Sequence, residues 1–203
     1  MLSSIKNFVR TKKYGEPIVV VSGLPRSGTS MMMKMLEAGG MAPMQDGVRV
    51  ADVDNPKGYY ELERIKDLEK ETDKSYIREG RGKVVKVISF LLKDLPDDNF
   101  YRVIFMRRNL DEVLKSQDKM IARLGSQDTT DAEVLKESYR NHIVSVRLMG
   151  RKAPNFEVIE VRYKQTIEDP ASIAAEVNAF LGGALDERAM ATMVDPNLYR
   201  NRA

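Results

Sequence analysis

A short apolar run leads directly into a glycine-rich turn near the start of the chain. Residues 17–22 read PIVVVS, a β-branched run that is typical of a buried parallel strand. Residues 21–30 then read VSGLPRSGTS, and helix-forming residues continue to residue 38. A strand, a glycine turn and a helix start direct several backbone N–H groups and the positive helix end at one point. This segment therefore predicts an anion site.

The loop departs at one position from the phosphate-binding pattern G-x-x-x-x-G-K-[ST]. Gly23 and Gly28 match the two glycines, but Thr29 stands where a nucleotide hydrolase carries lysine. Arg26 can donate to two oxygens of one anion. The hydroxyl donors of the loop are Ser27, Thr29 and Ser30. A glycine turn that only packs a strand against a helix is the alternative interpretation.

Strands and helices alternate along the rest of the chain. Further strands are expected at residues 83–89, 101–106 and 156–161. Helices are expected at residues 28–38, 61–74, 111–123, 131–149 and 169–181. This order predicts an α/β fold, a three-layer sandwich with a mostly parallel central sheet like that of the P-loop NTPases. Ligands of such sheets bind at the carboxyl ends of the strands.

The chain of 203 residues is long enough for a single domain over residues 1–203. Residues 1–16 are basic and weakly amphipathic, and we expect a plain N-terminal helix or arm. A transit peptide and a membrane-surface helix are the alternatives. Residues 41–82 are rich in turn signals and are expected to bind the acceptor or form a lid. No apolar run approaches the ~20 residues of a membrane span, so no integral membrane segment is expected.

The composition excludes several classes of site. The chain has no cysteine and one histidine, which argues against disulfides, thiol catalysis and a metal site, and fits a cytoplasmic location. Its net charge is only +3, and the basic and acidic residues are interleaved. Because nucleic-acid binders concentrate their positive charge in a patch, no nucleic acid is expected as a partner.

A second cationic site is predicted at the end of another strand. The run at residues 101–106 ends in Arg107 and Arg108, where an ATPase or kinase would need an aspartate for magnesium. Asn109 can cap the next helix, and Ser116 follows Arg108 by two helical turns. Two cationic groups are thus expected at the same edge of the sheet.

These segments resemble those of a known family. GLPRSGTS resembles the 5′-phosphosulfate loop of the sulfotransferases, and MRRNLDEVLKS resembles their 3′-phosphate motif. VRYKQTIEDP resembles the segment before their C-terminal helix, and DNPKGYYE resembles a segment of bacterial members. The resemblance covers residues 17–182. It implies transfer of a sulfuryl group from 3′-phosphoadenosine 5′-phosphosulfate (PAPS) to a hydroxyl or amine acceptor, giving adenosine 3′,5′-bisphosphate.

The resemblance also implies roles for particular residues. Arg26 would stabilise the leaving phosphate oxygen, and Tyr163 would face the adenine. The donor-binding residues would be Gly23, Pro25, Arg26, Ser27, Gly28, Thr29, Ser30, Arg108, Ser116 and Tyr163. Two carboxylates compete for the role of catalytic base, Asp46 and Glu61. His142 lies outside every family motif and is expected to be a packed or surface side chain.

Two other functions stay open from the residues. One is a small-molecule kinase or another phosphotransferase of the same fold, and the other is a non-catalytic nucleotide-binding protein. The acceptor is expected to be a small molecule or a carbohydrate, with lipid, phenol and peptide hydroxyls as further possibilities. Arg200 and Arg202 could reach the 3′-phosphate, although an exposed tail is the preferred interpretation.

Overall fold

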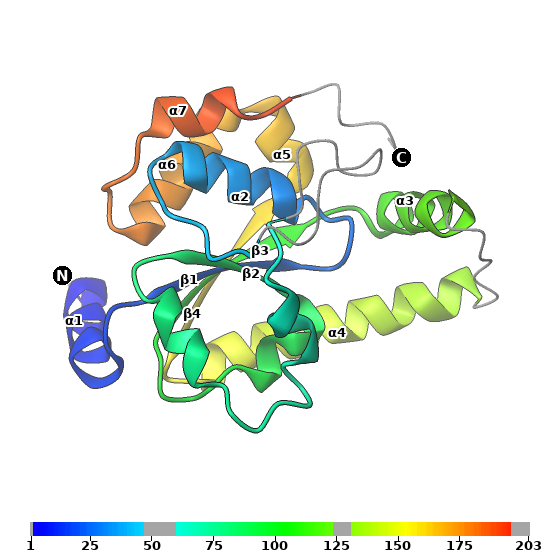
Figure 1. Cartoon of the computed structure of the whole chain (residues 1–203). Coiled ribbons are helices and arrows are strands. Elements are labelled where there is room, and N and C mark those ends of the chain that lie inside the picture. Colours follow the sequence, from blue (N-terminus) through cyan, green and yellow to red (C-terminus); the bar gives the residue numbers. More distant parts are fainter. Residues whose placement is uncertain (1, 47–59, 124–130, 196–203) are drawn as a thin grey trace.

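A four-stranded parallel sheet forms the centre of the molecule (Figure 1). The computed structural model describes residues 2–46, 60–123 and 131–195. The strand order is β2–β1–β3–β4, and each neighbouring pair is parallel. The strands are β1 (Ile18–Gly23), β2 (Val84–Ile88), β3 (Tyr101–Arg107) and β4 (Phe156–Arg162). All four predicted strands are confirmed, with ends within one residue of the predicted ones.

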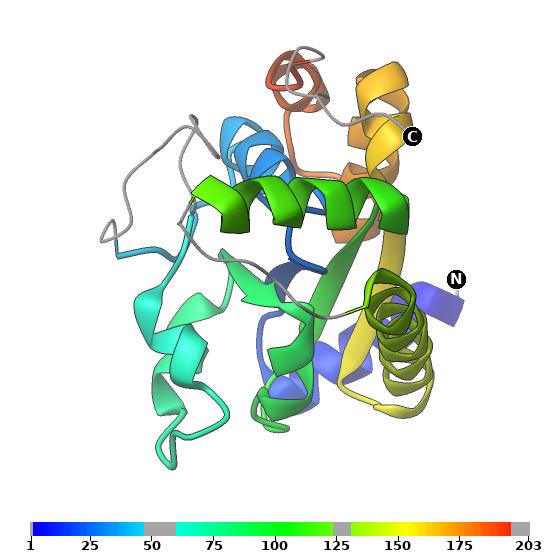
Figure 2. The same ribbon diagram turned by 90° about the vertical axis from the view of Figure 1, so that its right-hand side faces the viewer.

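Helices cover both faces of this sheet, which confirms the predicted three-layer sandwich (Figure 1). One face carries α2 (Thr29–Ala38), α5 (Tyr163–Glu168), α6 (Pro170–Leu181) and α7 (Glu187–Thr192). The other face carries α4 (Ala132–Lys152) and the 3₁₀ turn η3 (Ser89–Asp94). Viewed from the carboxyl ends of the strands, α3 (Leu110–Arg123) crosses in front of the sheet (Figure 2).

Alternation along the strands divides the core into two layers. Val19 and Val21 of β1 pack with the methionines of α2, of which Met32 and Met33 are fully buried. Val20, between those two valines, points to the opposite face of the sheet. There it packs in the apolar cluster that includes side chains of α4. Because both faces are covered, β1 is buried along its whole length, as its unbroken apolar run predicts.

The helix predicted at residues 61–74 is wrong. That segment contains the 3₁₀ turn η1 (Glu63–Asp67) and leads into a second one, η2 (Ser75–Gly80). Its apolar residues Leu62, Ile65 and Leu68 recur every third position, which matches three residues per turn better than 3.6. Ile65 and Leu68 are buried, so a 3₁₀ turn is enough to bring both into the core.

The single histidine of the chain connects α4 to η3. His142 Nε2 lies 2.9 Å from the Ser89 hydroxyl oxygen, and the Phe90 ring stacks on the imidazole with 4.0 Å between centroids. Burial lowers the pKa of His142 below its ordinary value. The side chain is therefore a packed one, which supports the sequence-based interpretation.

The His142 contact predicts a pH dependence of stability. The folded state disfavours the imidazolium, so the unfolded chain takes up the proton first, and the free energy of unfolding should fall as the pH drops below about 6.5. His142→Asn should flatten this part of the profile, measured by urea denaturation between about pH 7 and pH 5. Because the chain has one histidine, an unchanged slope in the variant would contradict this assignment.

Candidate functional site

The strand register brings the predicted motifs to one edge of the sheet. Gly23, at the end of β1, pairs with Ile88 of β2 and with Met106 of β3. Met106 in turn pairs with Val161 of β4. The carboxyl ends of the four strands therefore lie side by side, and the glycine loop leaves the sheet next to Arg107.

The loop after β1 has a tightly constrained backbone. Gly28 has φ 101°, and a Cβ atom there would lie 2.4 Å from the Tyr163 ring. Gly23 has φ 153°, and its Cβ would lie 2.4 Å from the Ser27 hydroxyl oxygen. Arg26 itself adopts φ 69°, a conformation that costs a non-glycine residue free energy. Both glycines are thus required by their conformation and by close contacts.

The loop contains a polar group suited to an anion. Ser27 is buried, and its Oγ has no hydrogen-bond partner within the residues that the structure describes. The first helical bonds of α2 run from the amides of Met31 and Met32 to the Gly28 carbonyl, so the Gly28 and Thr29 amides precede the helical ladder. Amides at this position and a buried hydroxyl are the groups that bind a phosphate or sulfate oxygen.

Arg26 and Ser116 are joined directly, although 90 residues separate them in sequence. The Arg26 Nε donates to the Ser116 hydroxyl at 3.0 Å. The Arg108 Nη1 donates to the Arg26 carbonyl at 3.1 Å. The structure therefore brings the predicted 5′ and 3′ motifs into a single hydrogen-bonded cluster.

Arg108 is held in a buried position by two neighbours. Its Nε donates to the Glu112 carboxylate at 2.8 Å, and the two side chains are only 8% and 5% exposed. Its guanidinium also lies over the Tyr163 ring, 4.5 Å from the centroid. Glu112 was not among the residues predicted from the sequence, although a carboxylate four residues after an arginine at a helix start indicates such a pair.

A second cluster lies beside the start of α2. Lys86, in the middle of β2, contacts the Glu61 carboxylate at 3.2 Å and the Ser30 hydroxyl oxygen at 3.5 Å. Lys66 contacts the other Glu61 oxygen at 3.1 Å. Lys86 was also not predicted as a site residue, although a lysine inside the otherwise apolar strand VVKVI is unusual.

The two candidate bases have different surroundings. Asp46 accepts a hydrogen bond from the Glu63 amide at 2.6 Å, at the start of η1. Glu61 reaches the glycine loop through Lys86 and Ser30. Asp46 thus resembles a turn-capping carboxylate, whereas Glu61 is part of a charged network beside the loop.

Some of the expected residues are not described by the structure. Residues 47–59 of the 41–82 region, and also Arg200 and Arg202, lie outside the described residues. His142 contacts η3 and takes no part in the two clusters described above. Within residues 2–46, 60–123 and 131–195, no three His, Cys, Asp or Glu side chains gather as possible metal ligands.

Comparisons with known proteins identify the family and the fold of the chain. Residues 16–200 match the model of the sulfotransferase domain family. Comparison with curated proteins gave no match. Mouse sulfotransferase SULT7A1, solved in a complex with PAP, has a TM-score of 0.52 at 16% identity, over 88% of this chain and 62% of its own. The sulfotransferase domain of the Synechococcus PCC 7002 olefin synthase has a TM-score of 0.50 at 18% identity, over 92% and 83%. At these identities the two structures show a shared fold.

Gly28 offers a test of the loop geometry with a matched control. Gly28 and Gly40 have nearly equal φ values of 101° and 100°, but only Gly28 faces a neighbouring ring, and nothing lies within 4 Å of a Cβ at Gly40. Both alanine variants should lose about 1 kcal/mol for the positive φ. Gly28→Ala should lose a further ~1–3 kcal/mol for the clash with Tyr163. Urea denaturation measures the difference, and equal losses would contradict the described contact.

Proposed function

The chain belongs to the sulfotransferase domain family, and we propose that it transfers a sulfuryl group from PAPS to a small-molecule or carbohydrate acceptor. The observation that carries the proposal is the cluster of Arg26, Ser116 and Arg108. A donor with separate phosphate groups on the 3′ and 5′ oxygens of its ribose needs two neighbouring cationic sites. A nucleoside diphosphate needs only one extended site.

The residues at the strand ends suit such a donor. Ser27 and the amides of Gly28 and Thr29 would hold the 5′ end, since a buried hydroxyl without a partner is satisfied by an anionic oxygen. Arg108 and Ser116 would hold the 3′-phosphate. Tyr163 lies beneath Arg108, where an aromatic face could contribute to the adenine site.

The bound donor supplies a sulfuryl group, whose bond to the 5′-phosphate oxygen breaks as a bond to the acceptor oxygen or nitrogen forms. Negative charge grows on the leaving phosphate, and fixed cations stabilise that charge best in a partly buried site. Arg26 is assigned this role. Lys86 is a second cation for the transferring group, because its side chain is only 10% exposed and lies beside Ser30.

Glu61 is assigned as the base that accepts the acceptor's proton. A carboxylate must be ionised to do so, and Glu61 contacts the ammonium groups of Lys86 at 3.2 Å and Lys66 at 3.1 Å. Lys86 contacts both the Glu61 carboxylate and the Ser30 hydroxyl, and this link to the glycine loop supports the role. Asp46 is the less favoured candidate, because its carboxylate caps η1.

Ligand-induced thermal stabilisation tests the donor class. Adenosine 3′,5′-bisphosphate at about 100 times its Kd should stabilise the protein by about 2.7 kcal/mol and raise Tm by several degrees. ADP and AMP, which lack the 3′-phosphate, should stabilise much less at equal concentration. Stabilisation by ATP with magnesium, and not by the bisphosphate, would instead identify a kinase of the same fold. Bisphosphate binding without sulfuryl transfer to any acceptor would indicate a non-catalytic member.

The two carboxylates can be separated by a matched pair of variants. Glu61→Gln should lower kcat at least ~100-fold, within the range of one general base, and remove the acidic limb of the pH–rate profile. Asp46→Asn should keep that limb and lose at most ~1 kcal/mol of stability with the weakened cap. The pH dependence of kcat for both variants measures this. A retained acidic limb in Glu61→Gln would transfer the role to another group.

A further inference from the structure

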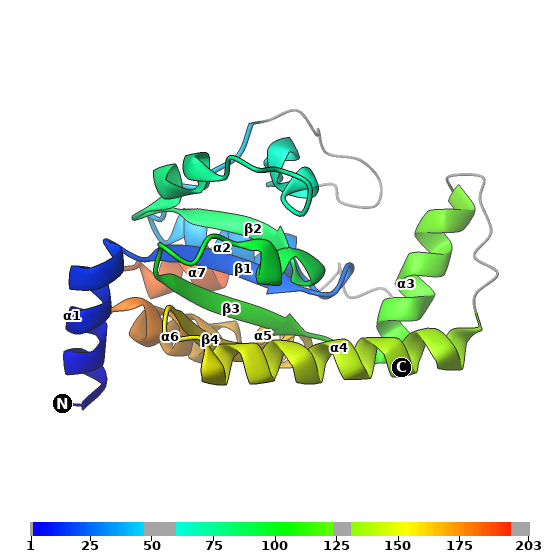
Figure 3. The ribbon, with the colours of Figure 1, turned by 90° about the horizontal axis from the view of Figure 1, so that it is seen from below.

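The helix α1 (Leu2–Tyr14) is the first element of the chain. It precedes the segment 16–200 that matches the family. It lies at the amino ends of the strands, whereas α3 lies at their carboxyl ends (Figure 3). The role of α1 is thus to be sought outside the donor and acceptor sites.

The contacts of α1 with the domain are largely polar. Arg10 Nε donates to the Pro154 carbonyl at 2.8 Å, and Arg10 Nη1 contacts Glu157 at 2.9 Å. The Arg10 guanidinium also lies 5.3 Å from the centre of the Phe100 ring. An arginine therefore faces the body of the protein, where an amphipathic helix packed on a core normally places apolar side chains.

Two apolar side chains of α1 face water. Phe8 is 71% exposed and Val9 is 57% exposed. Because Phe8 and Val9 are adjacent in the chain, their exposed side chains form an apolar patch on α1.

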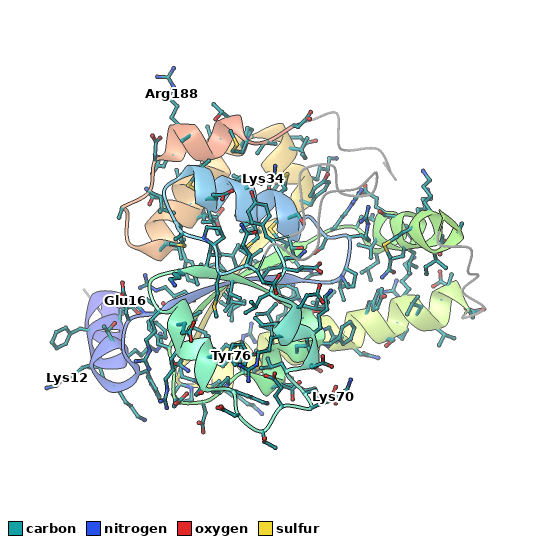
Figure 4. All side chains as sticks on the ribbon, in the orientation of Figure 1. Lys12, Glu16, Lys34, Lys70, Tyr76 and Arg188 are labelled. Atoms are coloured by element: carbon teal, nitrogen blue, oxygen red, sulfur yellow. The ribbon has the colours of Figure 1, made fainter. Side chains whose placement is uncertain are left out.

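The same helix carries charge of one sign. Its sequence LSSIKNFVRTKKY has four basic residues and no acidic one. Lys12 and Lys13 are exposed, and Lys12 points away from the body of the protein (Figure 4). Arg10 is paired with Glu157, so the net positive charge of the helix comes from its lysines. An exposed apolar patch beside lysines on the same helix is complementary to an anionic lipid surface.

We propose that α1 binds in the plane of a membrane surface that contains anionic phospholipids. Phe8 and Val9 enter the boundary between headgroups and acyl chains, and Lys12 and Lys13 lie among the anionic headgroups. Across the described residues, no helix combines the length and apolar character needed to cross a bilayer, so this contact is a peripheral one. The inference is independent of the proposed sulfuryl transfer.

Vesicle flotation of the full chain tests whether the apolar side chains Phe8 and Val9 bind the membrane. The protein should float with phosphatidylcholine vesicles that contain phosphatidylglycerol and should not float with pure phosphatidylcholine. The double variant Phe8→Ser/Val9→Ser should bind at least about tenfold more weakly, the scale expected for two apolar side chains. Val144→Ser/Leu148→Ser is the matched control, since both side chains are about half exposed on α4. Equal binding by the two double variants would overturn the proposal.

The role of the lysines of α1 is tested with two double variants that have the same net charge. Lys12→Glu/Lys13→Glu should abolish binding to the anionic vesicles. Lys70→Glu/Lys164→Glu alters exposed lysines on other elements and should reduce it only slightly. Equal losses would show adsorption through overall charge and overturn the proposal.

Sedimentation velocity tests whether α1 binds a second copy of the protein instead of a lipid surface. The parent chain could form a dimer that Phe8→Ser/Val9→Ser dissociates, and fail to bind vesicles. That result would show that α1 contacts a second copy of the protein and would overturn the lipid proposal. Retained far-UV circular dichroism and unchanged Tm should accompany every variant, because the altered side chains are exposed.

Discussion

The parallel register between β1 and β3 is the constraint on which the candidate site depends. Gly23 lies opposite Met106, so the loop after β1 and the arginine after β3 leave the sheet at the same level. This is why Arg108 reaches the Arg26 carbonyl at 3.1 Å. A register shift of two residues would keep every side chain on its own face but separate the two motifs by about 7 Å. Packing of β1 and β3 in the core resists such a shift, and the hydrogen bonds at the strand ends add to its cost.

The buried pair of Arg108 and Glu112 orients a cation before any ligand arrives. Removing two charges from water is costly, and the pair compensates with an ion pair, a carbonyl contact and an aromatic face. A rigid arginine in one motif and a strained backbone in the other give the edge a fixed geometry, which is what electrostatic stabilisation requires.

Local patterns predicted the scaffold, whereas tertiary contacts determined much of the site. The β-branched runs and the spacing of Gly23 and Gly28 indicated the strands and the loop, because both features are encoded within a few residues. Lys86 and Glu112 were missed because their importance depends on partners brought together by folding. The segment at 61–74 was assigned from its charged composition, although the three-residue spacing of its apolar positions pointed to 3₁₀ turns. Asp46 and Glu61 were indistinguishable in sequence and differ only in what surrounds them.

The helix α1 and the candidate site lie at opposite ends of the strands. Exposed Phe8 and the loop at Gly23 lie beyond opposite ends of β1, and six extended residues span about 20 Å. A molecule resting on a bilayer through Phe8 would present the edge with the candidate site outward to the aqueous phase. Acceptors would then have to be dissolved, or carried on a headgroup tall enough to bridge that height, while a hydroxyl lying within the same leaflet would stay out of reach.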